Sequence, residues 1–286
     1  MELDITTVDS FSSKPFGGNP AAVCVIPDGV ALSDTEMQQI AAEMNLSETA
    51  FLSCRPDLTF QSGQEFNLRW FTPTCEVPLC GHGTLASAAV LFKCRSNSNK
   101  ELVFHTLSGE LSAVLDGDFI GINLPLAVDV CATNREEIEE LLLLSVGDLP
   151  VQEVQYSSST KKLLVRLNDS VTMEQLTSIH PDTTAMLASH SGKVRGVIVT
   201  VKSKDCYDFV SRYFAPWNGI PEDPVTGSAH TVLAAYWGRV LKKDKMFACQ
   251  CSKRSGELKI EVCDNRVHIS GQASIVMTGK IYPRGK

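Results

Sequence analysis

Two stretches of the sequence place titratable side chains beside glycines at the start of an apolar segment. Residues 80–83 read Cys-Gly-His-Gly, and residues 222–228 read Glu-Asp-Pro-Val-Thr-Gly-Ser. A helix that begins at such a turn presents unpaired N–H groups, and glycine lets a ligand approach them closely. An imidazole (His82) or a carboxylate (Asp223) at the same place can orient a polar group of that ligand. Both stretches therefore predict binding sites for a small polar molecule.

The two stretches lie about half the chain length apart, and similar residues precede them. Phe-Thr-Pro at 71–73 precedes the first stretch, and Phe-Ala-Pro at 214–216 precedes the second. Internal similarity at half the length predicts a duplicated pair of domains, because solenoid repeats have much shorter periods. The two copies differ at their chemical residues. We therefore expect one asymmetric site between the halves, to which each copy contributes different groups.

The backbone of both turns is a candidate carboxylate site. Gly81 and Gly83 flank the histidine of the first turn, and Gly227 and Ser228 begin the second. Neither turn has the third glycine of a dinucleotide loop or the lysine of a phosphate loop. Helix capping, by Thr84 in one copy and by Ser228 in the other, is the alternative interpretation.

A proton-transferring base has to be found elsewhere in the chain. A racemase without a cofactor can use two thiols, but alignment of the copies places Pro224 opposite Cys80. A proline cannot transfer a proton, so the two-thiol mechanism is excluded and Cys80 alone is expected to be a packed thiol. Glu48 stands at the start of a predicted strand. If it is buried, desolvation would raise the pKa of its carboxyl toward neutrality, whereas an edge-strand glutamate in water would be inert.

The predicted elements are mostly short strands with a few helices between them. Residues 34–44 form an amphipathic helix with Ser33 as its N-cap. Residues 84–92 and 228–237 are apolar on nearly all sides, which is typical of buried helices. We predict an α+β fold of two similar domains, each a curved sheet or barrel around a central helix. The predicted domains are 1–127 and 128–286, and the last strands may return to the first domain.

Composition excludes several classes of function. The 286 residues carry a net charge of −7 with no basic block, so nucleic-acid and membrane partners are not expected. The ten cysteines form no zinc-ligand spacing, and we predict no metal. The opening residues are typical of a strand rather than of a secretory signal, so reduced cysteines and a cytoplasmic location are expected.

Five motifs in order along the chain resemble the PhzF family of phenazine-biosynthesis isomerases, whose fold is that of diaminopimelate epimerase. They are Phe16-Gly-Gly-Asn19-Pro20, Asn45-Leu-Ser47-Glu48-Thr-Ala-Phe51, Phe71-Thr-Pro73, Cys80-Gly-His82-Gly and Glu222-Asp223-Pro-Val-Thr-Gly227-Ser228. The resemblance implies that Glu48 is a general acid and base and that His82 and Asp223 hold the ligand. It implies carboxylate contacts at Gly81, Gly227 and Ser228, and we add Ser47 and Gly83 as substrate-binding neighbours. It also implies a homodimer, and an alternative family name suggests a WD-repeat protein partner.

The sequence thus predicts an isomerase without a cofactor that moves a proton on a small carboxylic acid, an amino or hydroxy acid derivative. Two alternatives stay open. A racemase or epimerase could use Glu48 and Cys80 as its two bases, and a former enzyme could persist as a protein-interaction module. The sequence does not name the substrate.

Overall fold

The computed structural model describes residues 1–55, 58–189 and 192–285. The chain forms two compact units, each described by itself. Unit 1 comprises Met1–Asn123 and Ser270–Lys286, and unit 2 comprises Leu124–Ile269. Both combine strands with helices, which confirms the predicted α+β class. Within the described ranges, no helix has the length and apolar character needed to cross a membrane.

Unit 1 is built from strands that pair in the order β17-β1-β2-β3-β4-β6-β7-β8. The β2–β3 and β4–β6 pairs are parallel, and the others along this order are antiparallel. The strands are β1 (Leu3–Ser10), β2 (Asn19–Ile26), β3 (Glu48–Cys54), β4 (Glu65–Phe71), β5 (Glu76–Val77), β6 (Glu101–Thr106), β7 (Gly109–Asp116), β8 (Phe119–Pro125) and β17 (Ala273–Ile281).

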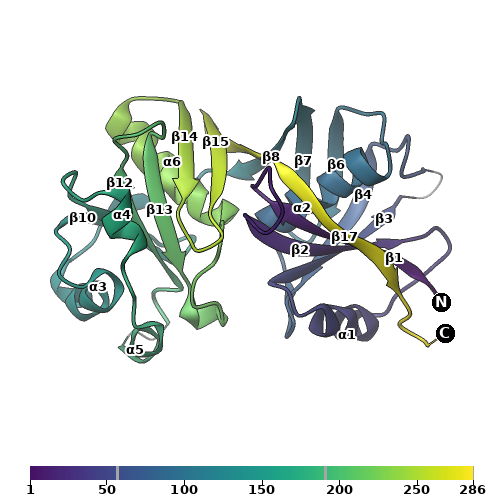
Figure 1. Cartoon of the computed structure of the whole chain (residues 1–286), viewed down its shortest axis with the longest axis horizontal. Helices are drawn as coiled ribbons and strands as arrows, with labels where there is room; N and C mark the ends of the chain where they lie inside the picture. Colours follow the sequence, from purple (N-terminus) through teal and green to yellow (C-terminus); the bar gives the residue numbers. More distant parts are fainter. Residues whose placement is uncertain (56–57, 190–191, 286) are drawn as a thin grey trace. The chain divides into compact units, whose positions relative to one another are not determined.

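Helix α2 (Gly81–Ala89) connects the parallel strands β4 and β6 and continues into a π-helical turn at Val90–Cys94. Every residue of α2 after Gly81 is buried. The helix contacts β1, β2, β3, β7 and β17, so strands from most of the unit surround it. Figure 1 shows α2 with these strands. The predicted buried helix is confirmed, but it begins three residues earlier than expected.

Helix α1 (Asp34–Met44) connects β2 to β3 and sets the position at which β3 begins. Ser33 and Glu36 form a capping box, which typically stabilises a helix start by about 1 kcal/mol. At the other end Asn45 adopts a left-handed conformation with φ of 49° and ends the helix. The chain can therefore turn sharply and enter β3 with Glu48 as its first residue.

Unit 2 repeats the pairing pattern of unit 1. Its strands follow the order β9-β10-β11-β12-β13-β14-β15, with β11–β12 and β13–β14 parallel and the rest antiparallel. Its strands are β9 (Val130–Ala132), β10 (Val151–Ser157), β11 (Lys162–Leu167), β12 (Gly196–Lys202), β13 (Phe209–Phe214), β14 (Lys245–Gln250), β15 (Gly256–Cys263) and β16 (Arg266–Gly271). Its helices are α3 (Glu139–Val146), α4 (Met173–Thr177), α5 (Thr183–Ser189) and α6 (Gly227–Leu241), with 3₁₀ turns at Glu136–Ile138 and Pro216–Asn218.

Helix α6 connects the parallel strands β13 and β14, as α2 connects β4 and β6. It packs against β9, β11 and β15, and its residues Tyr236 and Trp237 are fully buried. The matching pairing patterns therefore place α2 and α6 at equivalent positions in their units. The 3₁₀ turn at Glu136–Ile138 directly precedes α3, which begins at Glu139 because the backbone at Ile138 is not helical.

Candidate functional site

Glu48 lies at the start of β3 with its carboxylate turned toward the start of α2. The Oε2 atom of Glu48 is 3.0 Å from Nε2 of His82, and the Glu48 side chain is only 12% exposed. Oε2 is inaccessible to solvent and forms no well-directed hydrogen bond among the described residues. The two nitrogen and oxygen atoms are close, but no hydrogen bond joins them because the Nε2–H bond is directed toward the Ser47 hydroxyl. The structure thus presents a buried carboxylate oxygen that is still able to take a proton.

His82 is held by contacts at both of its ring nitrogens. Nε2 lies 3.2 Å from Oγ of Ser47, and Nδ1 lies 3.3 Å from Nδ2 of Asn19. The Ser47 hydroxyl also faces Oδ1 of Asn19 at 3.3 Å and the carbonyl of Pro20 at 3.1 Å. The Ser10 hydroxyl donates to the His82 carbonyl at 2.8 Å. This network fixes both the ring and the backbone of His82.

The Asn19 amide selects the tautomer of a neutral His82. As the amide is oriented, its N–H group donates to Nδ1, so a neutral ring carries its proton on Nε2. That N–H points to the Ser47 hydroxyl, which in turn can donate to Asn19 or Pro20. A positively charged ring would instead need the oxygen of Asn19 at Nδ1, which rotation of the amide by 180° provides. By rotating its amide, Asn19 can therefore keep a hydrogen bond to His82 in either protonation state of the ring.

Burial and mutual attraction act in opposite directions on Glu48 and His82. Burial favours a neutral Glu48, but the charge of His82 and polar contacts from His82 and Ser47 outweigh it and lower the carboxyl pKa below 4.5. Burial also favours a neutral His82, but Cys80 and Glu48 raise the imidazole pKa well above 6.5. Since burial raises the pKa of the Cys80 thiol, Glu48 supplies the negative charge that His82 meets near neutral pH.

Cys80 is the N-cap of α2. Its Sγ accepts a hydrogen bond from the Gly83 N–H at 3.2 Å and lies 3.5 Å from Nδ1 of His82. Gly83 has no room for a side chain, because a Cβ there would lie 2.7 Å from the Trp70 ring. The alternative in which Thr84 caps this helix is wrong, since the Thr84 hydroxyl donates back to the Cys80 carbonyl at 2.7 Å.

Glu48, Cys80 and His82 are also the kinds of residue that bind zinc, and one ligand atom of each lies within 4.8 Å of the others. The imidazole nevertheless stands between the two acidic groups. Cys80 approaches Nδ1 and Glu48 approaches Nε2, which face opposite sides of the ring. Each acidic group therefore has a different ring nitrogen as its neighbour.

The predicted residues of the second stretch form a cluster at the start of α6 in unit 2. The Thr226 hydroxyl donates a very short hydrogen bond to Oδ2 of Asp223, and the Thr226 N–H donates to Oε1 of Gln250 at 2.9 Å. Gln250 in turn donates to the Asp223 carbonyl at 2.7 Å. Asp223 is buried, at 7% exposure. Thr226 and Gln250 thus fix the side chain and the backbone of this aspartate.

The start of α6 differs from the expectation that Ser228 caps it. Thr226 is the N-cap residue, and its side chain makes no capping hydrogen bond because it is bonded to Asp223. The Ser228 carbonyl accepts from the Thr231 hydroxyl at 2.9 Å. Across the described residues, the backbone N–H groups of Gly227 and Ser228 meet no acceptor. Two unpaired donors at a helix start are a potential anion site.

Glu222 stands directly before Asp223 but is held by a different partner. Its carboxylate forms a two-point ion pair with Arg212, at 2.7 and 2.8 Å. Arg212 also donates to the carbonyls of Leu176, Thr177 and Ile179. Glu222 therefore anchors the 222–228 loop on β13 and α4 and takes no part in the Asp223 cluster.

Sequence reasoning missed three polar residues of these clusters. Asn19 and Ser10 both contact His82, and Lys162 is buried at the start of β11. Asn19 stands within one of the quoted motifs, which was a usable signal. Ser10 ends a strand and Lys162 follows a serine-rich turn, and nothing in their local sequence separates them from ordinary polar residues.

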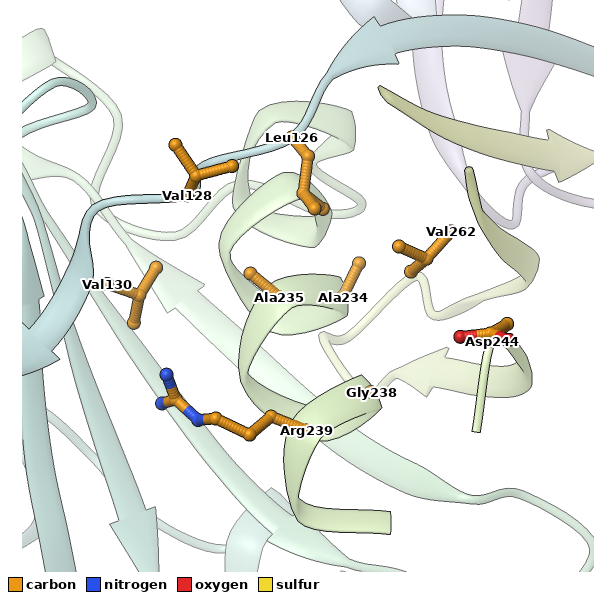
Figure 2. Close-up of a pocket in the computed structure, with 9 residues that line it drawn as sticks. All are labelled: Leu126, Val128, Val130, Ala234, Ala235, Gly238, Arg239, Asp244 and Val262. Atoms are coloured by element: carbon orange, nitrogen blue, oxygen red, sulfur yellow. The ribbon is translucent and has the colours of Figure 1, made fainter. Parts of the chain in front are cut away.

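A groove of about 380 Å³ lies elsewhere on unit 2, along the second half of α6. Figure 2 shows the small residues Ala234, Ala235 and Gly238 of the helix facing Leu126, Val128 and Val262, with Arg239 and Asp244 at its edge. None of the predicted site residues lines it.

Comparison with known proteins agrees with the motifs. Residues 8–279 match the family model of phenazine biosynthesis-like proteins, PhzC-PhzF. The chain is 50% identical to phenazine biosynthesis-like domain-containing protein 1 of Mus musculus, over 98% of this chain and 99% of that protein. It is 42% identical to an uncharacterized isomerase of Pseudomonas aeruginosa, over 99% of this chain and 100% of that protein.

Solved structures agree on the fold. The PhzF-family phenazine biosynthesis protein of Enterococcus faecalis is 38% identical and superposes with a TM-score of 0.86, over 99% of this chain and 100% of that one. Proteins titled as epimerases share the fold at much lower identity. The predicted diaminopimelate epimerase-like fold is confirmed.

Proposed function

The chain belongs to the PhzC-PhzF family of phenazine biosynthesis-like proteins and is an isomerase in the general sense of that family; we propose that Glu48 is its general acid and base. In this proposal the enzyme moves a proton on a small carboxylic acid without a cofactor. One observation carries it: the solvent-inaccessible Oε2 of Glu48, 3.0 Å from His82, has no well-directed hydrogen bond within the described ranges.

The ionised form of Glu48 is the form that removes a proton. The nearby imidazole lowers the pKa of Glu48 despite its burial, so the carboxylate is ready to accept a proton from a carbon acid near neutral pH. Water is largely excluded from the pair, which strengthens each electrostatic contact. Return of the same proton to a different carbon completes an isomerisation, and Glu48 is regenerated without any other reactant.

His82 has the task of stabilising charge. When Glu48 takes up a proton, the ion pair between Glu48 and His82 is lost, and the imidazole becomes free to face negative charge that develops on the substrate. The Asn19 amide can keep either protonation state of the ring hydrogen-bonded. We therefore assign His82 to stabilising and orienting the substrate, and proton transfer to Glu48.

The groups of unit 2 are assigned to binding the substrate. The unpaired N–H groups of Gly227 and Ser228 suit a carboxylate, and the Asp223 carboxylate suits an amino or hydroxyl group. Ser47, Gly81 and Gly83 remain predicted neighbours of the substrate. Ser47 contacts His82 and Gly83 binds Cys80, so both also have a structural task.

The alternative racemase would need Cys80 as a second base. Its thiol is occupied as the acceptor of the Gly83 N–H, and burial raises the pKa of that thiol. A neutral, capped thiol is a poor base. The structure therefore favours Glu48 as the single proton carrier.

Solvent deuterium exchange tests the proposal. The purified protein is incubated in D₂O with a mixture of small amino, hydroxy and aromatic acids, and mass spectrometry identifies any compound that gains deuterium. We expect Glu48→Gln to slow exchange by about 10²–10⁴-fold, the usual contribution of a general base. The control is Glu43→Gln, which removes an exposed carboxylate from α1 and should leave exchange unchanged. Exchange that is equally fast in Glu48→Gln would contradict the assignment.

A further inference from the structure

Lys162 is a buried cation without a counter-ion in contact. The residue is 8% exposed, and its ammonium makes no hydrogen bond and no ion pair among the described residues. The nitrogen lies 5.9 Å from the centre of the Tyr213 ring, and the Asp223 carboxylate acts on it only through space. Burying an ammonium without a partner is costly, and burial lowers the pKa of Lys162 to about 8. An anion bound beside the ammonium would offset this cost.

The strand geometry turns Lys162 toward α6. Side chains alternate along a strand, so Lys162 shares a face of β11 with Arg166. The Arg166 guanidinium lies over the Trp237 ring at 4.8 Å and donates to the Tyr236 hydroxyl at 3.3 Å, so this is the face that packs on α6. Leu163 and Val165 point to the opposite face, into another core cluster.

Lengths along the strand and the helix place Lys162 near the start of α6. Four residues of strand span about 13 Å, and the nine residues from Tyr236 back to Gly227 span about 13.5 Å of helix. The strand and the helix run in the same direction, because β11 is antiparallel to β13 and α6 returns from β13 to its parallel neighbour β14. The electrostatic influence of Asp223, three residues before Thr226, agrees with this placement.

In unit 1, the residue that corresponds to Lys162 contacts the start of the crossover helix directly. Asn19 begins β2 as Lys162 begins β11: Ser10 pairs with Asn19, and Ser157 pairs with Lys162. The side chain of Asn19 reaches His82 in the first turn of α2, at 3.3 Å. A side chain at this position of the fold therefore reaches the start of the crossover helix.

We propose that Lys162 is the charged residue of the carboxylate site that the proposed function assigns to the N–H groups of Gly227 and Ser228, and that it pairs with the carboxylate of an amino or hydroxy acid. Lys162 supplies the full positive charge and the helix start supplies two directed donors, while Asp223 accepts from the amino or hydroxyl group next to the carboxylate. The identity of this acid as the substrate rests on the proposed isomerase function. The binding site itself does not depend on it.

Binding of salicylate, a hydroxy acid, tests the site without any need for turnover. Isothermal titration at pH 7 compares the wild type with Lys162→Met, which keeps the length of the side chain and removes its charge. We expect the Kd for salicylate to rise at least tenfold in Lys162→Met. Salicylamide, which lacks the carboxylate, should bind both proteins equally. Lys202→Met, at the exposed end of β12, is the matched control for charge and should change the Kd less than twofold.

The following results distinguish failure of the proposed carboxylate site from failure of the proposed isomerase function. Equal salicylate affinity in the wild type and Lys162→Met, or no saturable binding by the wild type, would overturn the proposal. Salicylate binding that is unchanged in Glu48→Gln supports the anion site even if deuterium exchange disproves the isomerase assignment. Thermal unfolding of Lys162→Met without ligand should occur at or above the wild-type temperature, because the variant loses a buried unpaired charge. A marked drop would instead indicate a structural role for Lys162 and would overturn the proposal.

Discussion

The starts of α2 and α6 hold equivalent positions in two units of like topology, and their chemistry is opposite in kind. In unit 1 the first residue of β3 is Glu48, and the helix start carries His82 and the capping thiol of Cys80. In unit 2 the first residue of β12 is Gly196, and the helix start is left uncapped with Asp223 beside it. The pairing pattern is common to both units, and only a few side chains make one helix start a buried ion pair and leave the other with unpaired N–H groups.

The strand register also identifies Trp70 in unit 1 and Tyr213 in unit 2 as equivalent residues. Ala50 pairs with Trp70 two residues after Glu48, and Ile198 pairs with Tyr213 two residues after Gly196. Trp70 leaves no space for a side chain at Gly83, whereas Tyr213 leaves none at Gly196. A large aromatic residue at the same place thus excludes a side chain from the helix turn in one unit and from the strand start in the other.

The largest expected loss of stability comes from placing a side chain at Gly196, the position in unit 2 that corresponds to Glu48. In Gly196→Ala the new Cβ would lie 2.1 Å from the Tyr213 hydroxyl oxygen, far inside contact distance. Overpacking of a buried site usually costs about 1–3 kcal/mol of unfolding free energy, and urea denaturation measures it. Gly279→Ala, where nothing lies within 4 Å of the new Cβ, is the control and should change stability by less than about 0.5 kcal/mol. A neutral Gly196→Ala would show that Tyr213 does not exclude a side chain there.

A second effect concerns the coupling of Glu48 and His82, which has no counterpart at the start of α6. The raised pKa of His82 gives stability below about pH 6.5 that is lost as the pH rises through the folded-state pKa. The lowered pKa of Glu48 gives stability above about pH 4.5 that is lost as the pH falls through the folded-state pKa. The pair therefore stabilises the fold most between these two limits.

NMR titration of the His82 ring measures this coupling directly. In the wild type we expect a midpoint above 6.5, because Glu48 favours the charged ring. In Glu48→Gln burial acts against the charged ring without the opposing carboxylate, so the midpoint should fall. Glu43→Gln, which removes an exposed carboxylate from α1, is the control and should leave the His82 midpoint in place. An unchanged His82 midpoint in Glu48→Gln would show that the two groups are not coupled.

The smallest effect concerns the capping thiol of α2. The residue at the N-cap of α6 is Thr226 and not Pro224, which the alignment of the two stretches places opposite Cys80. Cys80→Ala removes the acceptor of the Gly83 N–H and should cost about 1 kcal/mol of unfolding free energy, a typical loss for an N-cap. Cys80→Ser should retain most of that stability, because serine is a good N-cap. Both variants should keep deuterium exchange within about tenfold of the wild type, in line with a capping task. Loss of exchange in Cys80→Ser at normal stability would instead support the racemase alternative.

The sequence by itself determined the local features. Helix α1 follows from its capping box, its apolar spacing and the Asn45 stop, all of which are short-range interactions that one segment can satisfy alone. The two buried helices follow from runs that are apolar on all sides. The motifs identified the family, and with it the importance of Glu48 and His82. Motifs of this kind are defined by residue types and their order, which can be read from one sequence without a structure.

Only the tertiary structure decided what each of these side chains touches. Glu48 and His82 are 34 positions apart and meet only through strand pairing, so the sequence did not reveal their contact. Burial alone predicted a raised pKa for the Glu48 carboxyl, and that prediction is wrong because His82 and Ser47 lower it. Local patterns suggested Thr84 and Ser228 as N-caps. In the structure the Thr84 hydroxyl binds the Cys80 carbonyl instead. The N-cap of α6 is Thr226, whose hydroxyl binds Asp223. Lys162 looked like one more lysine after a polar turn. Its burial follows from the strands and helix that close around it, and these are long-range contacts that no single segment encodes.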